Sequence, residues 1–131
     1  MLNPETFELI NYYWIAIAVI IFLVLVIFKI KTPYGRHANK NWGIMIPNKW
    51  GWFIMELPAF IIMPIVTLYG PSEKGTLTYL LILLWLTHYF NRTFIFPFKI
   101  KTDNKKMPLL IAGSAILFNS VNGFLNGYYL G

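Results

Sequence analysis

The sequence predicts an all-α integral membrane protein with four transmembrane helices. Hydrophobic residues make up 57% of its 131 residues and charged residues only 12%, whereas charged residues account for about a quarter of a soluble domain. The mean hydropathy of +0.58 agrees with this. Four apolar segments are each long enough to cross a bilayer, which takes about 20 residues. They cover residues 9–30, 50–69, 76–98 and 108–129 of a single predicted membrane domain, 1–131. None shows the strict polar–apolar alternation of barrel strands, so we expect helices.

The first apolar segment, residues 9–30, is expected to remain in the protein as a membrane helix. It is longer than the apolar region of a typical signal peptide. The residues before it are acidic, Glu5 and Glu8, and no cleavage site of small residues follows it.

The basic residues predict the orientation of the helices. Nine of the eleven lysines and arginines lie in and beside the first and third connections, and the second connection, 70–75, has only Lys74. The positive-inside rule therefore places the basic loops in the cytoplasm and the N-terminus on the opposite side. Basic residues gathered in short loops also argue against a nucleic-acid-binding face. The absence of cysteine excludes disulfides and thiolate ligands.

Glu56 is the first candidate functional residue, because it places a carboxylate inside the second apolar segment. An ionisable side chain at membrane depth costs about 3 kcal/mol on insertion scales, so it marks a functional site by default. Trp52 lies one turn before it on the same helix face. Pro58 removes a backbone hydrogen bond and predicts a kink with a freed carbonyl at Ile54. A carboxylate beside a kink indicates a polar cavity.

The third apolar segment carries the predicted partners of Glu56. Tyr89 and Arg92 share a helix face, and Arg92 is the expected counter-ion, unless it extends to the membrane surface. A phenol beside a carboxylate can donate a hydrogen bond to a carbonyl oxygen and stabilise the charge that develops there. His88 is expected to be a packing residue. No metal site is expected, because the only other histidine is His37 and no ligand spacing is present.

The fourth apolar segment combines two patterns. Asn119, Asn122 and Asn126 form a polar stripe, which must line a bundle interior or a ligand site, since an unpaired amide in lipid is costly. Gly123 and Gly127 form a GxxxG pattern, typical of closely packed helices.

A further group of polar residues lies in the first basic connection. Tyr34, Arg36 and His37 are either plain interfacial anchors or side chains that fold over a phosphate-bearing ligand at the membrane surface.

Four blocks in order carry a family resemblance: Tyr-Gly-Arg-His at 34–37, Glu-Leu-Pro-Ala-Phe at 56–60, His-Tyr-Phe-Asn-Arg-Thr-Phe at 88–94 and Asn-Gly-Phe-Leu-Asn-Gly-Tyr-Tyr at 122–129. Together they resemble the steroid 5α-reductase family. The resemblance implies an NADPH-dependent membrane reductase of a carbon–carbon double bond conjugated to a ketone, acting on an apolar enone or steroid-like lipid.

The resemblance also implies roles for individual residues. Glu56 and Tyr89 match the family's catalytic residues, which hydrogen-bond the carbonyl oxygen of the substrate. The substrate-binding residues it implies are Trp52, Arg92, Phe118 and Asn122, and the cofactor-binding residues in this chain are Tyr34, Arg36 and His37. Met55 and Ser114 depart from the steroid-reducing pattern, which leaves the identity of the substrate open.

The resemblance covers nearly all of this chain but only the N-terminal half of the family, whose members have about seven helices. We therefore expect an incomplete NADPH site and a possible partner that supplies the C-terminal half. The chain is interpreted as a truncated product, a partial gene model or one half of a split protein.

Other functions are compatible with the same residues. The chain could be a small oligomeric transporter in which Glu56 couples transport to protons, or a non-catalytic membrane subunit in which Glu56 and Arg92 only clamp two helices together. A membrane methyltransferase is a weaker alternative, because its cofactor residues would also lie in the missing half.

Overall fold

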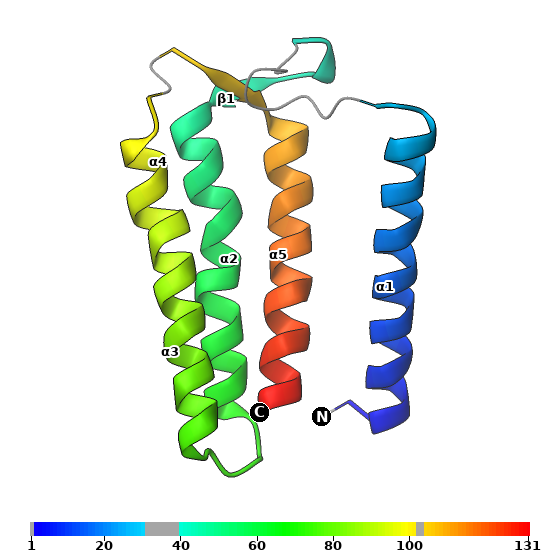
Figure 1. The fold of residues 1–131 in the computed structure, drawn as a ribbon, viewed down its shortest axis with the longest axis vertical. Helices are drawn as coiled ribbons and strands as arrows, with labels where there is room; N and C mark the ends of the chain where they lie inside the picture. Colours follow the sequence, from blue (N-terminus) through cyan, green and yellow to red (C-terminus); the bar gives the residue numbers. More distant parts are fainter. Residues whose placement is uncertain (1, 31–39, 102–103) are drawn as a thin grey trace. The chain divides into compact units, whose positions relative to one another are not determined.

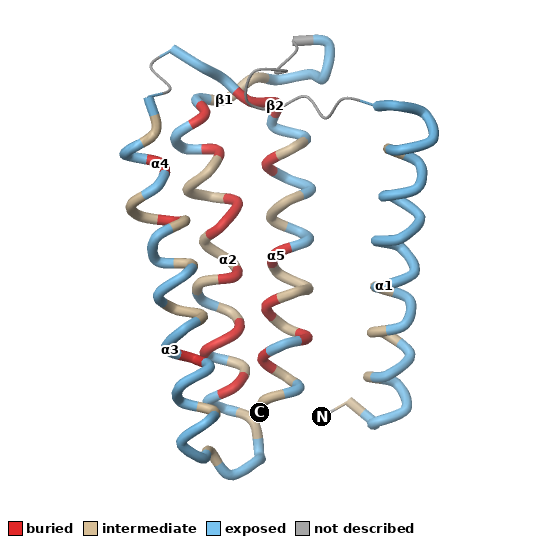
Figure 2. Tube along the Cα trace, in the orientation of Figure 1, coloured by how far each residue is buried: buried red, intermediate tan, exposed pale blue. Residues whose placement is uncertain are grey.

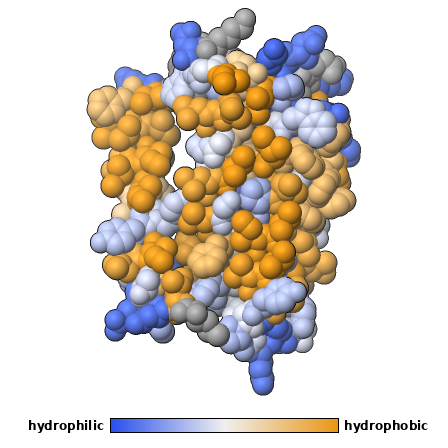
Figure 3. Space-filling view, turned by 180° about the vertical axis from the view of Figure 1, so that it is seen from behind, coloured by the Kyte–Doolittle hydropathy of each residue, from blue (hydrophilic) through white to orange (hydrophobic). Residues whose placement is uncertain are grey.

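The computed structural model describes residues 2–30, 40–101 and 104–131. The chain divides into two compact units, Met1–Thr32 and Pro33–Gly131. In both units hydrophobic side chains cover the middle of the visible face and hydrophilic ones gather towards the ends (Figure 3). The single domain predicted for 1–131 stays a prediction.

Helix α1 (Pro4–Ile27) is the first unit's only helix among the described residues. Asn3 caps it, since its Oδ1 accepts the N–H of Glu5 at 3.0 Å, and Pro4 occupies a first-turn position where a missing N–H costs little. This cap explains why the helix begins before the predicted range 9–30. None of its residues is buried (Figure 2), as suits a helix that presents apolar side chains to lipid.

Helices α2 (Asn48–Tyr69) and α5 (Leu109–Leu130) form the centre of the second unit. They run side by side in the same direction (Figure 1) and hold most of the buried residues (Figure 2). Helix α3 (Thr76–Phe90) returns along α2 in the opposite direction. The site described below lies where these three helices meet.

Three helices, α1, α2 and α5, are long and apolar enough to cross a membrane. The span predicted for 76–98 is divided into α3, the π-helical turn η3 (Asn91–Ile95) and the short helix α4 (Phe96–Lys99). Pro97 accounts for the break, because it has no N–H to donate to the previous turn, and the N–H of Phe96 reaches back to Asn91 in the π pattern. The all-α membrane architecture is therefore supported, whereas the four-span count and the seven-helix bundle stay predictions.

Two short strands join the starts of α2 and α5, a feature that the sequence did not predict. Strand β1 (Met45–Pro47) pairs antiparallel with β2 (Lys106–Pro108), and Ile46 lies opposite Met107. The Met107 side chain is fully buried against Gly51, where a Cβ would have no room. Strands of three residues show too little alternation to be recognised by pattern.

Close packing of α2 against α5 depends on the GxxxG glycines. A Cβ on Gly127 would lie 2.7 Å from the carbonyl oxygen of Met63 and 2.8 Å from Cβ of Val66. A Cβ on Gly123 would lie 3.3 Å from Cβ of Ile62. Small residues at these positions let the two backbones approach each other, as in other membrane helix pairs.

Replacing Gly127 by alanine should destabilise the contact between α2 and α5 by about 1–3 kcal/mol, the usual cost of overpacking. Gly123→Ala is the matched control and should cost less, since its new methyl group meets a side chain at a longer distance. The measurement is unfolding of the detergent-solubilised chain by sodium dodecyl sulfate, followed by circular dichroism. Equal effects of the two substitutions would contradict this account of the packing.

Candidate functional site

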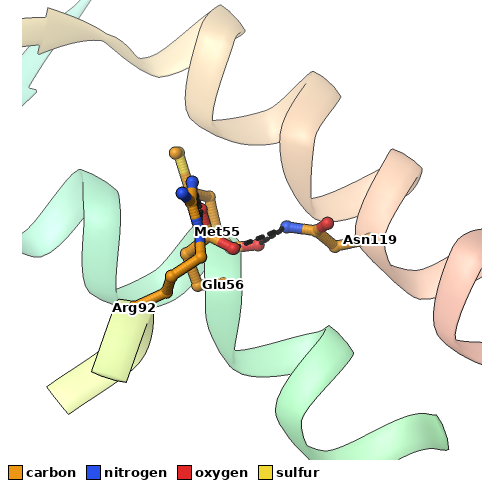
Figure 4. Close-up of polar contacts among 4 residues, drawn as sticks. All are labelled: Met55, Glu56, Arg92 and Asn119. Carbon is orange, nitrogen blue, oxygen red and sulfur yellow. Dashed lines mark hydrogen bonds and ion pairs between the residues drawn. The ribbon is translucent and has the colours of Figure 1, made fainter. Parts of the chain in front are cut away.

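Glu56 lies on the face of α2 that is turned towards the other helices, and its side chain is only 4% exposed. Its Oε1 accepts hydrogen bonds from two nitrogens of Arg92, Nε at 3.0 Å and Nη2 at 2.5 Å (Figure 4). The Arg92 side chain, on η3, is 38% exposed. The predicted ion pair between the second and third apolar segments is therefore formed, with one buried and one partly exposed partner.

Asn119 approaches Glu56 from the opposite side, from α5. Its Nδ2 donates to the carbonyl oxygen of Met55 at 2.5 Å and lies 3.5 Å from Oε2 of Glu56 (Figure 4). The sequence predicted a freed carbonyl at Ile54, but the carbonyl that receives this side chain is the next one along the chain. Both carboxylate oxygens of Glu56 thus have partners, one on each neighbouring helix.

Aromatic rings surround the exposed side of the ion pair. The guanidinium of Arg92 lies 5.3 Å from the ring centroid of Trp52, within the range of a cation–π interaction. Trp52 also packs edge-to-face on Phe96, with ring centroids 5.1 Å apart. Trp52 thus offers an aromatic contact to Arg92 on the helix that carries the carboxylate.

Tyr89 brings a phenol to the same place from α3. Its phenol lies close to the side chain of Asn122 on α5 and to the charges of Glu56 and Arg92. The ring packs against that of Trp85 with centroids 4.7 Å apart and an interplanar angle of 36°, and Trp85 donates an Nε1 hydrogen bond of 2.8 Å to the carbonyl of Ala59. A phenol, a carboxylate, a guanidinium and two amides therefore meet at the junction of three helices.

Four further site residues were predicted: Phe118, Tyr34, Arg36 and His37. Phe118 is 49% exposed on α5, one turn before Asn122. Tyr34, Arg36 and His37 lie outside the described residues. Asn126, the last residue of the predicted stripe, is exposed and donates to Asn122 Oδ1 at 3.1 Å. The stripe thus runs from the buried carboxylate to the edge of the helix.

His88 packs edge-to-face on Tyr89, with centroids 5.0 Å apart. In the described part of the chain, no group of three or more histidine, cysteine or acidic residues could hold a metal ion.

Comparisons with known proteins relate the sequence of this chain to a family. No protein-family model matches the sequence. The chain is 32% identical to the steroid 5α-reductase DET2 of Solanum lycopersicum, over 98% of this chain and 50% of that protein. It is 31% identical to the DET2 of Gossypium hirsutum, over 79% of this chain and 42% of that protein. It is also 33% identical to 3-oxo-5-alpha-steroid 4-dehydrogenase 1 of Homo sapiens, over 76% of this chain and 39% of that protein.

The chain is related to the steroid 5α-reductases. It spans about half the length, or less, of the curated relatives it matches. The steroid 5α-reductase resemblance suggested by the four sequence blocks is confirmed by these matches.

Two features of this 5α-reductase relative escaped the sequence analysis. The first is the direct pairing of Asn119 with Met55 and Glu56, since a stripe of asparagines does not reveal which amide faces the carboxylate. The second is the π-helical turn that carries Arg92; such turns are frequent at functional sites. Pro97 was the available signal for this turn, because proline interrupts the helical hydrogen bonds before it.

The ion pair predicts an asymmetric response to mutation. Arg92→Gln leaves the buried Glu56 carboxylate without its counter-ion and should destabilise the chain by about 1–3 kcal/mol, below the ~3–5 kcal/mol of fully buried pairs because Arg92 is 38% exposed. Glu56→Gln leaves a cation that can reach water, so it should cost less. The double variant should recover part of the loss from Arg92→Gln.

Stability of the three variants in detergent, measured by thermal unfolding, checks this order. A larger loss of stability for Glu56→Gln than for Arg92→Gln would contradict this account, in which the unpaired buried carboxylate is the costlier group.

Proposed function

We propose that this chain forms the carbonyl-binding side of an NADPH-dependent membrane reductase that acts on apolar enones such as 3-oxo steroids. The observation that carries the proposal is the convergence of Glu56, Tyr89 and Asn122 from three helices at one point. The names of the relatives supply the substrate class.

Tyr89 is the residue best suited to polarise the substrate. In the reduction of an enone, hydride adds to the β-carbon, negative charge moves to the carbonyl oxygen, and a proton then reaches the α-carbon. A hydrogen-bond donor placed at that oxygen stabilises the charge as it develops. The Tyr89 phenol is such a donor; it lies near Asn122, and its ring packs against Trp85.

Glu56 has a second role that depends on its protonation. As a carboxylate paired with Arg92 it can only accept hydrogen bonds, and it orients Arg92 and Asn119 around the site. To donate to a carbonyl oxygen it must carry a proton, which requires the Arg92 contact to open. The ion pair thus defines a resting state in which Tyr89 is the available acid.

The predicted substrate-binding residues suit an apolar substrate. Trp52 and Phe118 offer aromatic surface, and Arg92 and Asn122 offer donors near the reacting oxygen. An apolar substrate can reach such a site directly from the bilayer.

NADPH would supply the hydride when bound. The described residues around Glu56 do not form a complete dinucleotide site, because the cation there, Arg92, is already engaged by the carboxylate. We propose that Tyr34, Arg36 and His37 contribute from the first connection and that a C-terminal half supplies the rest of the site. The basic connections would then lie in the cytoplasm, with the N-terminus on the opposite side.

Tyr89→Phe tests the proposal without the cofactor. A 3-oxo-4-ene steroid carrying ¹³C at its ketone should show a lowered carbonyl stretching frequency when bound to the solubilised chain, and Tyr89→Phe should reverse most of that shift. Tyr79→Phe is the matched control, because Tyr79 is exposed on the same helix, away from the site. It should leave the shift unchanged.

Activity is tested by co-expressing the chain with the C-terminal half of a curated relative and following oxidation of NADPH by the steroid. Tyr89→Phe should lower the rate by about 10²–10³-fold, as loss of one oxyanion donor does. If the steroid shows no shifted carbonyl and the paired halves no activity, the reductase proposal fails. Loss of stability alone in Glu56 variants would then favour the helix-clamp function.

A further inference from the structure

A pocket lies beside the starts of α2 and β2 and the end of α4. Its volume is about 360 Å³. Three of its lining residues are lysines, Lys49, Lys105 and Lys106. It does not include Glu56, Tyr89 or Arg92, so it is distinct from the candidate site.

The lysines of this pocket have no acidic partner among residues 2–30, 40–101 and 104–131, where the recorded ion pair is that of Glu56 with Arg92. The Lys49 ammonium lies 4.0 Å from the ring centroid of Phe98, a cation–π contact that holds the charge at the pocket wall. Lys105 and Lys106 also line the pocket, just before and at the start of β2. The pocket therefore concentrates positive charge that the described residues leave uncompensated.

Asn48 adds a polar side chain to the wall of the pocket. The residue is only 5% exposed and lines the pocket, and its backbone N–H donates to the carbonyl of Lys105 at 3.0 Å. Its side-chain amide is a hydrogen-bond donor for an acceptor bound in the pocket.

The backbone adds to the attraction for anions. Asn48 begins the 22-residue helix α2, which has no side-chain cap, so first-turn N–H groups and the positive end of the helix dipole face this region. An amide, three ammonium groups and a helix start together match a phosphate better than a carboxylate, because a phosphate carries more charge and more acceptor oxygens.

We propose that this pocket binds a phosphate group, presented by an anionic phospholipid at the membrane surface. The wall beside the lysines is apolar: Trp50 and Phe98 are 53% and 50% exposed, and their rings contact each other edge-to-face. Aromatic side chains of this kind are typical of the interface between headgroups and acyl chains, and basic pockets between membrane helices bind lipid headgroups. A phosphate that carries acyl chains would use both walls.

Lipid retention by the purified chain provides the test. Native mass spectrometry of the detergent-solubilised chain should show preferential binding of phosphatidic acid over phosphatidylcholine with the same acyl chains. The double variant Lys49→Gln/Lys106→Gln should weaken phosphatidic acid binding about tenfold or more. Lys101→Gln is the matched control, because Lys101 is an exposed lysine of the same connection that does not line the pocket. It should bind as the wild type does.

Asn48→Ala should weaken phosphatidic acid binding although it changes no charge, whereas Lys49→Arg/Lys106→Arg should retain binding. Loss of binding on a neutral substitution distinguishes a specific site from general attraction between charges. Competition with inorganic pyrophosphate identifies the source of the phosphate: displacement at equal concentration would indicate a soluble phosphate ligand instead of a lipid. Equal lipid binding by the glutamine double variant and the Lys101 control would overturn the proposal. None of these measurements depends on reductase activity.

Discussion

A carboxylate buried among apolar helices is tolerated only where other groups replace the water it has lost. In this chain the replacement comes from two helices at once: Arg92 covers one oxygen of Glu56, and Asn119 lies by the other. The position of α3 and η3 against α2, and of α5 against α2, is therefore tied to one side chain. Tyr89 lies near Glu56, Arg92 and Asn122, so the ion pair that links the helices lies within the candidate site.

The helices themselves were largely predictable. Long apolar segments bounded by lysines and prolines leave few alternatives in a bilayer, and α2 and α5 lie within two residues of their predicted ranges. The interruption at η3 was not predicted, because a π-helical turn depends on how Pro97 meets the preceding turn and not on composition. Nor were β1 and β2, whose pairing joins segments about 60 residues apart and is set by the helices that follow them.

The candidate site was likewise predictable only in part. Glu56, Tyr89 and Arg92 could be singled out because each is chemically unexpected in an apolar segment, and helical spacing put Tyr89 and Arg92 on one face. Spacing within one helix says nothing about which faces meet across helices. The sequence therefore could not show that Asn119, as well as Asn122, lies at the junction. The hydrogen bond from Asn119 to the Met55 carbonyl, next to Glu56, is visible only in the three-dimensional structure.

The order in which these partners are made has a consequence for biogenesis. Arg92 lies 36 residues after Glu56 in the sequence, and Asn119 lies 63 residues after Glu56. Helix α2 is therefore synthesised before either partner of the carboxylate. During translation the carboxylate must stay near water, within the insertion machinery or in protonated form, until the next two helices arrive. Stable insertion of helix α2 in the bilayer therefore depends on residues that are synthesised after it.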